Sequence, residues 1–223
     1  MMITANSYSA QAIQRAYDRR KWVYSKTVAV VEWPYHEQAI DAASIQPGES
    51  VLEVAVGPGL ALRELAGRVG RDTTVHGADL SPGMLSMTRQ RLLDAGFARL
   101  DLRQADARRL PFADQQFDVV YNAYMLDLIP EADMPGILAE FKRVLKPGGR
   151  MVLLNMSKAS AASRDMRERL YTLLPKALTL YLLGACRPVL MSPAVQAAGF
   201  MDVRRTFIAG RAPSEIVTAI RPR

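Results

Sequence analysis

Residues 51–59 read VLEVAVGPG, and this stretch carries the clearest structural signal in the chain. Its first six residues form a short apolar run with β-branched members, which is typical of a buried strand. Gly57 and Gly59 predict a tight turn, and the apolar stripe within residues 60–69 predicts a helix after that turn. Such a strand, turn and helix present backbone N–H groups at the carboxyl edge of a sheet, where open α/β folds bind ligands.

Strands and helices continue to alternate along the chain. Ser81 and Pro82 are the favoured residue types for the N-cap and the first turn of a helix. We expect strands at residues 73–78, 100–104, 117–122 and 150–155, and helices at 82–93 and 133–145. Later residues predict helical stretches at 163–186 and 192–199 and strands at 201–208 and 215–220. The first fifty residues predict helices at 11–31 and 35–43, with a break at Trp33 and Pro34.

This alternation predicts parallel βαβ units with right-handed crossovers. The expected fold class is α/β: a Rossmann-like, doubly wound, mostly parallel seven-stranded sheet with an antiparallel last strand. A helical cover at the N-terminus and a helical insertion before the last two strands complete it. Because the chain shows no repeat and no linker, residues 1–223 are expected to form a single domain. Its parts are a helical cover (1–45), a core (46–158), a second helical cover (159–200) and closing strands (201–223).

The composition is that of a globular protein, with 223 residues of which 49% are hydrophobic and 23% charged. The lone Cys186 excludes an intramolecular disulfide, and one cysteine with two histidines is too few for a usual zinc site, so we expect no metal. The net charge of +7 permits an anionic substrate, a membrane surface or nucleic acid as a partner. No apolar run approaches the roughly 18 residues of a membrane span, and residues 1–18 lack a secretory pattern, so we expect a soluble cytoplasmic protein.

Three acidic residues, Glu53, Asp79 and Asp106, lie at successive expected strands and should face one crevice. Asp79 is placed to accept hydrogen bonds from two ribose hydroxyls, the role of an acid at this position in dinucleotide-binding folds. A dinucleotide itself is disfavoured, because Leu62 stands where the third glycine of the fingerprint belongs and because Glu53 would repel a pyrophosphate. Glu53 instead suits a ligand that carries an ammonium group.

Four blocks of sequence, in order, resemble the class I S-adenosylmethionine-dependent methyltransferases. The resemblance is greatest to the family of ubiquinone and menaquinone C-methyltransferases and bacterial phospholipid N-methyltransferases. The blocks are VLEVAVGPGLAL (51–62), VHGADLSPGMLSMTRQRL (75–92), QADARRLPFADQQFDVVYNAYMLDLIP (104–130) and ILAEFKRVLKPGGRMVLLNMSK (137–158). They cover roughly residues 46–158, which the resemblance makes the cofactor-binding core, with S-adenosyl-L-methionine as the cofactor.

The resemblance also implies roles for individual residues. Glu53, Gly57 and Gly59 would face the methionine part of the cofactor, and Asp79 would bind the ribose. The adenine would lie on Leu80 and Met84, with its amino group bonded to Asp106 beside Ala107, and Asn122 would close the pocket. Tyr17 or Tyr24 would form a lid from the N-terminal helix that covers the cofactor in relatives, with ordinary aromatic packing as the alternative. The chain departs from the family at Ala55, where glycine is usual, and at Pro58, which lacks a backbone donor.

Further candidates lie outside this cofactor set. Asp127 follows the fourth expected strand and is a candidate general base or cation anchor, with a helix cap or a solvated carboxylate as the alternative. His76, in an apolar strand, is a poor catalytic candidate, and so is His36, which the cover could bring to the cleft. The basic residues and leucines from Arg164 to Arg187 predict either an amphipathic helix with a solvated face or a cover helix that contacts a membrane surface or lines an apolar substrate channel.

We therefore expect a methyltransferase that acts by in-line transfer on a small or lipidic, fairly apolar acceptor, of quinone type or otherwise aromatic. A phospholipid amine N-methyltransferase is one alternative. A non-catalytic nucleoside-binding protein, its site degenerate at Ala55 and Pro58, is an alternative of another class. Nucleic acid is not an expected partner, because the chain shows no RNA-binding module. The expected partner is a small-molecule or lipidic substrate, with peripheral membrane-surface contact, and the oligomeric state is left open.

Overall fold

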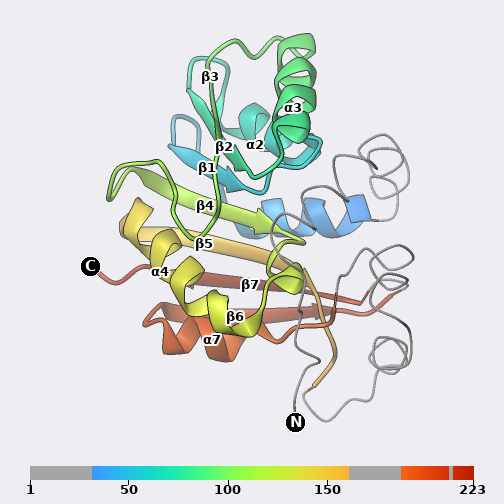
Figure 1. Cartoon of the computed structure of the whole chain (residues 1–223), viewed down its shortest axis with the longest axis vertical. Helices are drawn as coiled ribbons and strands as arrows, with labels where there is room; N and C mark the ends of the chain where they lie inside the picture. The colour runs from blue at the N-terminus through green and yellow to red at the C-terminus, as the bar shows by residue number, and fades with distance from the viewer. Residues whose placement is uncertain (1–31, 161–186, 211–212) are drawn as a thin grey trace.

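The computed structural model describes residues 32–160, 187–210 and 213–223. Its centre is a seven-stranded sheet with the order β3-β2-β1-β4-β5-β7-β6 (Figure 1). The pairs β1 with β2, β1 with β4, β2 with β3, and β4 with β5 are parallel, whereas β7 is antiparallel to both β5 and β6. The predicted Rossmann-like sheet with an antiparallel last strand is confirmed.

The strands and helices follow the predicted order along the chain. The strands are β1 (Val51–Val54), β2 (Val75–Asp79), β3 (Leu100–Gln104), β4 (Phe117–Ala123), β5 (Leu145–Met156), β6 (Met201–Ile208) and β7 (Ser214–Ile220). The helices are α2 (Leu60–Val69), α3 (Pro82–Asp94), α4 (Met134–Val144) and α7 (Met191–Ala197), with short 3-10 helices η1 (Leu126–Leu128) and η2 (Glu131–Asp133). Residues 32–42 are also helical.

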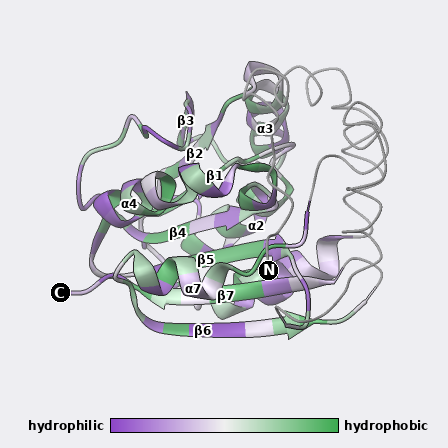
Figure 2. Ribbon diagram, turned by 60° about the horizontal axis from the view of Figure 1, so that its bottom comes forward, coloured by the Kyte–Doolittle hydropathy of each residue, from purple (hydrophilic) through white to green (hydrophobic). Residues whose placement is uncertain are grey.

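Two apolar cores cover the two faces of the sheet. Alternate residues of a strand point to opposite faces, so Leu52 and Val54 of β1 join the core beneath α4 and α7, while Val51 joins the core beneath α2 and helix 32–42. Strands buried on both faces are nearly continuous apolar runs, as the predominantly apolar colour of β5 in Figure 2 shows. The edge strand β6 is more hydrophilic because one long side of it has no neighbouring strand.

Two predicted boundaries are wrong for identifiable reasons. β5 begins at Leu145 rather than Arg150, because residues 146–149 form a bulge within the strand: Phe117 pairs with Leu145, and Val119 pairs with Arg150. The expected break at Trp33 and Pro34 is also absent, since both residues are already helical.

The local signals gave other boundaries correctly. Strands β3 and β6 have the predicted bounds, and the side chain of Ser81 caps α3 by accepting a hydrogen bond from the Met84 N–H at 3.1 Å. The predicted helices at 11–31 and 163–186, with Tyr17, Tyr24 and Cys186, lie outside the described residues. Within the described part of the chain, no helix has both the length and the apolar character needed to cross a membrane.

Candidate functional site

A cavity opens at the carboxyl ends of β1, β2 and β4, where the sequence predicted a ligand site. Its empty space amounts to about 860 Å³, including the part open to solvent. Most of the side chains around it are apolar. The lining residues are Val54, Ala55, Gly57, Asp79, Leu80, Ser81, Met84, Ala105, Asp106, Ala107, Arg108, Ala123, Tyr124, Met125, Leu128 and Ile129.

Asp79 is held at the mouth of the glycine turn. Its Oδ2 accepts a hydrogen bond from the Gly57 N–H at 2.9 Å, and its Oδ1 accepts one from the Ser81 N–H at 2.8 Å. A carboxylate offers about four acceptor positions in all, and the carboxylate of Asp79 borders the cavity. The same two bonds fix the relative positions of the β1 turn and the start of α3.

A second cavity adjoins the first and contains the other acid of the β1 region, Glu53. The two cavities share four lining residues, Ala55, Gly57, Ala123 and Tyr124. Glu53 is only 2% exposed, and its Oε2 has no hydrogen-bond partner among the described residues. Burial, and secondarily the charge of Asp79, raises the pKa of Glu53 well above its ordinary value. A buried carboxyl group without a partner on one oxygen is suited to a cationic ligand.

The residues expected around a flat, apolar group line the first cavity on the side of α3. Leu80 and Met84 come from the β2 end and the first turn of α3, and Ala107 follows β3. Asp106 also lines the cavity, but its carboxylate already forms an ion pair with Arg108 at 2.7 Å, and Arg108 holds its pKa below the usual value. Any hydrogen bond from a ligand to Asp106 would therefore be shared with Arg108.

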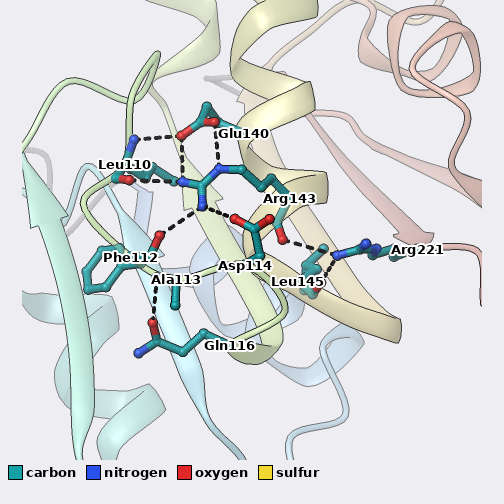
Figure 3. A network of polar contacts seen from close by, with 9 residues as sticks. All are labelled: Leu110, Phe112, Ala113, Asp114, Gln116, Glu140, Arg143, Leu145 and Arg221. Carbon is teal, nitrogen blue, oxygen red and sulfur yellow. Dashed lines mark hydrogen bonds and ion pairs between the residues drawn. The ribbon is translucent and has the colours of Figure 1, made fainter.

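The loop that carries Asp106 and Ala107 is tied to α4 by one arginine (Figure 3). The Arg143 guanidinium donates to Glu140, to Asp114 at 2.7 Å and to the carbonyl groups of Leu110 and Phe112 at 2.9 Å. Glu140 in turn accepts a hydrogen bond from the Leu110 N–H at 2.8 Å. This network lies away from the cavity and fixes the course of the loop that borders it.

Two predicted site residues lie outside both cavities and have structural contacts instead. Gly59 precedes α2 with a φ of +77°, and a Cβ at this position would lie 2.8 Å from the side chain of Thr88, so glycine permits α2 and α3 to pack closely. Asn122 is fully buried and donates from Nδ2 to the Val54 carbonyl at 2.8 Å. The structure thus gives Gly59 and Asn122 packing and hydrogen-bond roles, and their predicted roles at the ligand stay predictions.

One of the expectations for Asp127, a solvated carboxylate, is wrong. It lies in η1 and is fully buried, so it is not a solvated carboxylate, and it is not among the residues lining either cavity. Its Oδ2 accepts a hydrogen bond from the Met156 N–H at 3.3 Å. The loop after β4 presents its neighbours Met125 and Leu128 to the cavity instead.

Several cavity residues were missed by the sequence analysis. Tyr124 lines both cavities with a φ of +49°, a conformation that is costly for a bulky residue and concentrates at functional sites. Its position directly after β4 is a signal that could have found it. Glu32 and Trp33 line the second cavity together with His36, whose Nδ1 is 3.0 Å from the Tyr121 hydroxyl. No local pattern marked Glu32.

Comparison with known proteins places this fold and cleft in a class. Residues 51–149 match a family model described as a methyltransferase domain. This match identifies residues 51–149 as a methyltransferase domain, and the sheet order with antiparallel β7 and the acid-bearing cleft after β1 and β2 agree with the class I S-adenosylmethionine-dependent members.

The similar proteins include enzymes that are named for different substrates. The chain is 38% identical over 134 residues to the ubiquinone/menaquinone biosynthesis C-methyltransferase of Teredinibacter turnerae, covering 60% of this chain and 53% of the relative. It is 28% identical over 183 residues to an aklanonic acid methyltransferase of Streptomyces sp. (strain C5), covering 82% of each. The chain thus spans about half the length of the C-methyltransferases that it matches.

A solved structure agrees with the fold. The N-methyltransferase of Bradyrhizobium japonicum in complex with S-adenosyl-L-homocysteine matches with a TM-score of 0.69 at 17% identity, covering 95% of this chain and 99% of that one. At this identity the likeness concerns the fold alone.

Proposed function

We propose that the protein binds S-adenosyl-L-methionine and transfers its methyl group to a small or lipidic, apolar acceptor of the quinone or other aromatic type. The observation that carries the proposal is Glu53. It is a buried carboxyl group with one unpartnered oxygen in a cavity continuous with the one that Asp79 borders. The cofactor carries an ammonium group at one end and a ribose in its middle, and this pair of acids matches both.

The remaining lining residues fit the rest of the cofactor. Leu80, Met84 and Ala107 offer apolar contact to an adenine ring, and the carboxylate of Asp79 at the cavity would accept hydrogen bonds from the ribose hydroxyls. The four residues shared by the two cavities would then lie beside the sulfur atom. Three of them are Ala55, Gly57 and Ala123, whose small size leaves room for a second molecule next to the reacting carbon.

The chemistry requires mainly orientation. The cofactor supplies a methyl carbon that its sulfonium charge already activates toward nucleophiles. The protein's contribution is then to hold the acceptor in line with that carbon and to exclude water. Met125, Leu128 and Ile129 form an apolar wall of the first cavity and suit a ring or an alkyl chain better than a charged acceptor. The C-methyltransferase relatives are named for ubiquinone and menaquinone, and these names support the quinone type of acceptor.

Mass spectrometry with isotope-labelled cofactor tests the proposal. The acceptor panel should contain 1,4-naphthohydroquinone, a simple phenol, phosphatidylethanolamine and a short RNA. We expect label on the hydroquinone or the phenol. Label on phosphatidylethanolamine would instead establish a phospholipid amine methyltransferase. Calorimetry with S-adenosyl-L-homocysteine accompanies the panel: cofactor binding without any transfer would favour a nucleoside-binding protein, and absence of binding would contradict the whole proposal.

A further inference from the structure

Glu32 is an acidic residue of the second cavity that the cofactor site does not require. It lies on helix 32–42 and lines this cavity together with Trp33, His36 and Tyr124. Three aromatic side chains thus line the cavity beside the carboxyl groups of Glu32 and Glu53. The unpartnered, buried Oε2 of Glu53 on the same cavity is an independent sign that a polar ligand belongs there.

Among the described residues, the charge that acts on the Glu32 carboxyl group is negative. Burial, and secondarily the charge of Asp127 on η1, raises the pKa of Glu32 from 4.5 to about 8. Desolvation lowers the pKa of His36, on the same helix, to about 4, so this imidazole is neutral at physiological pH. The Tyr124 hydroxyl lies 3.0 Å from Ser214 Oγ, and burial, with the charges of Glu32 and Asp127, raises its pKa. The buried Arg187 donates to the carbonyl groups of Asp127 and Ile129.

The position of Glu32 relative to the reacting carbon follows from the shared lining of the cavities. With adenosine in the first cavity and the methionine part in the second, the transferred methyl group lies near Ala123 and Tyr124. An acceptor in line with that group approaches beside Tyr124. Glu32 lines the same cavity as Tyr124, and its charge contributes to the raised pKa of the Tyr124 hydroxyl.

On the basis of the proposed function, we propose that Glu32 is the general base that removes the hydroxyl proton of a phenol- or hydroquinone-type acceptor. The acceptor O–H bond breaks and its proton passes to the Glu32 carboxylate, while the electron pair moves through the ring. The ring carbon next to the hydroxyl-bearing carbon then forms a bond to the methyl group, and the S–CH₃ bond breaks with its electrons on sulfur. The ring-carbon hydrogen then moves to the oxygen to restore the aromatic ring, and Glu32 releases its proton to solvent.

The environment of Glu32 fits this role. A carboxylate with an ordinary pKa is a weak base toward a phenol, whereas a base whose pKa lies near the working pH transfers protons efficiently. The sulfonium charge of a bound cofactor would favour the ionised form of Glu32, because an opposite charge nearby lowers the pKa of a carboxyl group. Glu32 therefore becomes competent as a base when the methyl donor is in place.

Kinetics of matched variants test this role. Methyl transfer to 1,4-naphthohydroquinone under anaerobic conditions should be measured in single turnover, with saturating cofactor, between about pH 5 and pH 9. For Glu32→Gln we expect a roughly 10²- to 10⁴-fold lower rate, loss of the rise in rate with pH, and an S-adenosyl-L-homocysteine Kd within about threefold of wild type. Glu37→Gln is the control, because Glu37 is an exposed acid of the same helix outside both cavities, and it should behave as wild type.

A stability measurement checks the environment of Glu32 without activity. With a pKa of 4.5 unfolded and about 8 folded, Glu32 holds a proton in the folded state that the unfolded chain has released between these pH values. Its contribution to stability is therefore present below about pH 4.5 and is lost as pH rises toward 8. As the pH rises from about 5.5 to about 8.5, the urea midpoint of wild type should fall. The urea midpoint of Glu32→Gln should fall less, because glutamine does not titrate.

Two results would overturn the assignment while leaving the proposed function intact. One is a Glu32→Gln variant that transfers methyl at the wild-type rate and with the wild-type pH profile. The other is a variant whose only defect is a cofactor Kd raised more than about tenfold, which would make Glu32 part of the cofactor site. If wild type binds the cofactor but methylates neither hydroquinone nor phenol, the aromatic acceptor fails and the role of Glu32 fails with it.

Discussion

Asp79 performs two functions with one carboxylate. It anchors the Gly57 and Ser81 N–H groups and borders the cavity in which the ribose would lie. Asp79→Asn keeps the shape but removes the charge and turns one acceptor into a donor that faces another donor. Hydrogen bonds to charged groups contribute about 1.5–3 kcal/mol, so calorimetry should show a roughly tenfold to hundredfold weaker S-adenosyl-L-homocysteine affinity. Asp94→Asn, at the exposed end of α3, is the control, and an unchanged Kd for folded Asp79→Asn would refute the ribose assignment.

Ala55 has a left-handed backbone conformation, with a φ of +61°, at the position where the family usually has glycine. Ala55→Gly should raise the free energy of unfolding by about 0.5–1 kcal/mol, because the strain of about 1–2 kcal/mol exceeds the entropic cost of glycine. Urea unfolding measures the change. Ala66→Gly, in the interior of α2, should destabilise by about 1 kcal/mol or more and serves as the opposite control. A less stable Ala55→Gly protein would show that the alanine methyl contributes more by packing than it costs in strain.

At the level of elements, the contact between α2 and α3 depends on Gly59. A Cβ at Gly59 would meet the Thr88 side chain at 2.8 Å and its Cα at 2.9 Å, whereas a Cβ at Gly57 would meet nothing within 4 Å. Gly59→Ala should therefore cost about 2–4 kcal/mol of stability, from left-handed strain and overpacking together. Gly57→Ala should cost about 1–2 kcal/mol, from strain alone.

For cofactor affinity the two glycine variants should rank in the opposite order from their order in stability. Gly57 lines both cavities and Gly59 lines neither, so Gly57→Ala should weaken S-adenosyl-L-homocysteine binding more. Thermal unfolding and calorimetry on the same samples provide both numbers. Equal stability losses in the two variants would contradict the packing role of Gly59.

The loop between β3 and β4 takes its shape from α4 through Arg143. Arg143→Met leaves Glu140 and Asp114 without their partner and should reduce stability by roughly 1–3 kcal/mol. It should also weaken cofactor binding, because the same loop carries Asp106 and Ala107 at the cavity. Unfolding and binding measurements should be compared with Arg68→Met. Arg68 pairs with exposed Asp41 and Glu64, so its loss should cost less than about 1 kcal/mol and leave affinity unchanged. If cofactor binding is unchanged in Arg143→Met, the Arg143 network does not shape the cofactor site.

At the scale of the whole molecule, the excess of basic residues supports a proposed contact with an anionic membrane surface. The chain has 29 basic and 22 acidic residues, and the stretch from Arg164 to Arg187 combines arginines with leucines; positions 164–186 of it lie outside the described residues. Basic residues near an anionic surface contribute about 1 kcal/mol each, and salt screens this attraction. The protein should sediment with phosphatidylglycerol vesicles at low salt and be released at high salt.

Charge reversal tests the same contact. Arg167→Glu combined with Lys176→Glu should lower the vesicle-bound fraction and leave S-adenosyl-L-homocysteine binding unchanged, with phosphatidylcholine vesicles as the uncharged control. A wild-type protein that stays in the supernatant with phosphatidylglycerol at low salt would contradict the membrane contact and favour a water-soluble acceptor.

Signals carried by neighbouring residues predicted most of the fold. Apolar runs located the strands, Ser81 and Pro82 located the start of α3, and the alternation of strand and helix implied the parallel sheet. The bulge in β5 escaped prediction because Lys146 to Gly149 form a typical turn sequence. Leu145 before them and Arg150 after them both pair with β4, which keeps these residues within the strand.

The chain's own pattern was enough to predict the class of the domain and the positions of Glu53 and Asp79, because both acids lie near the ends of strands that local sequence defines. Folding decided the rest of the site. Glu32 and Tyr124 are 92 positions apart and meet only because helix 32–42 packs over the end of β4. Asp127 is buried although its loop suggested exposure, and Gly59 serves helix packing although its motif suggested a ligand. Burial, and with it the raised pKa of Glu32, depends on neighbours that are distant in sequence, and such neighbours exist only in the folded molecule.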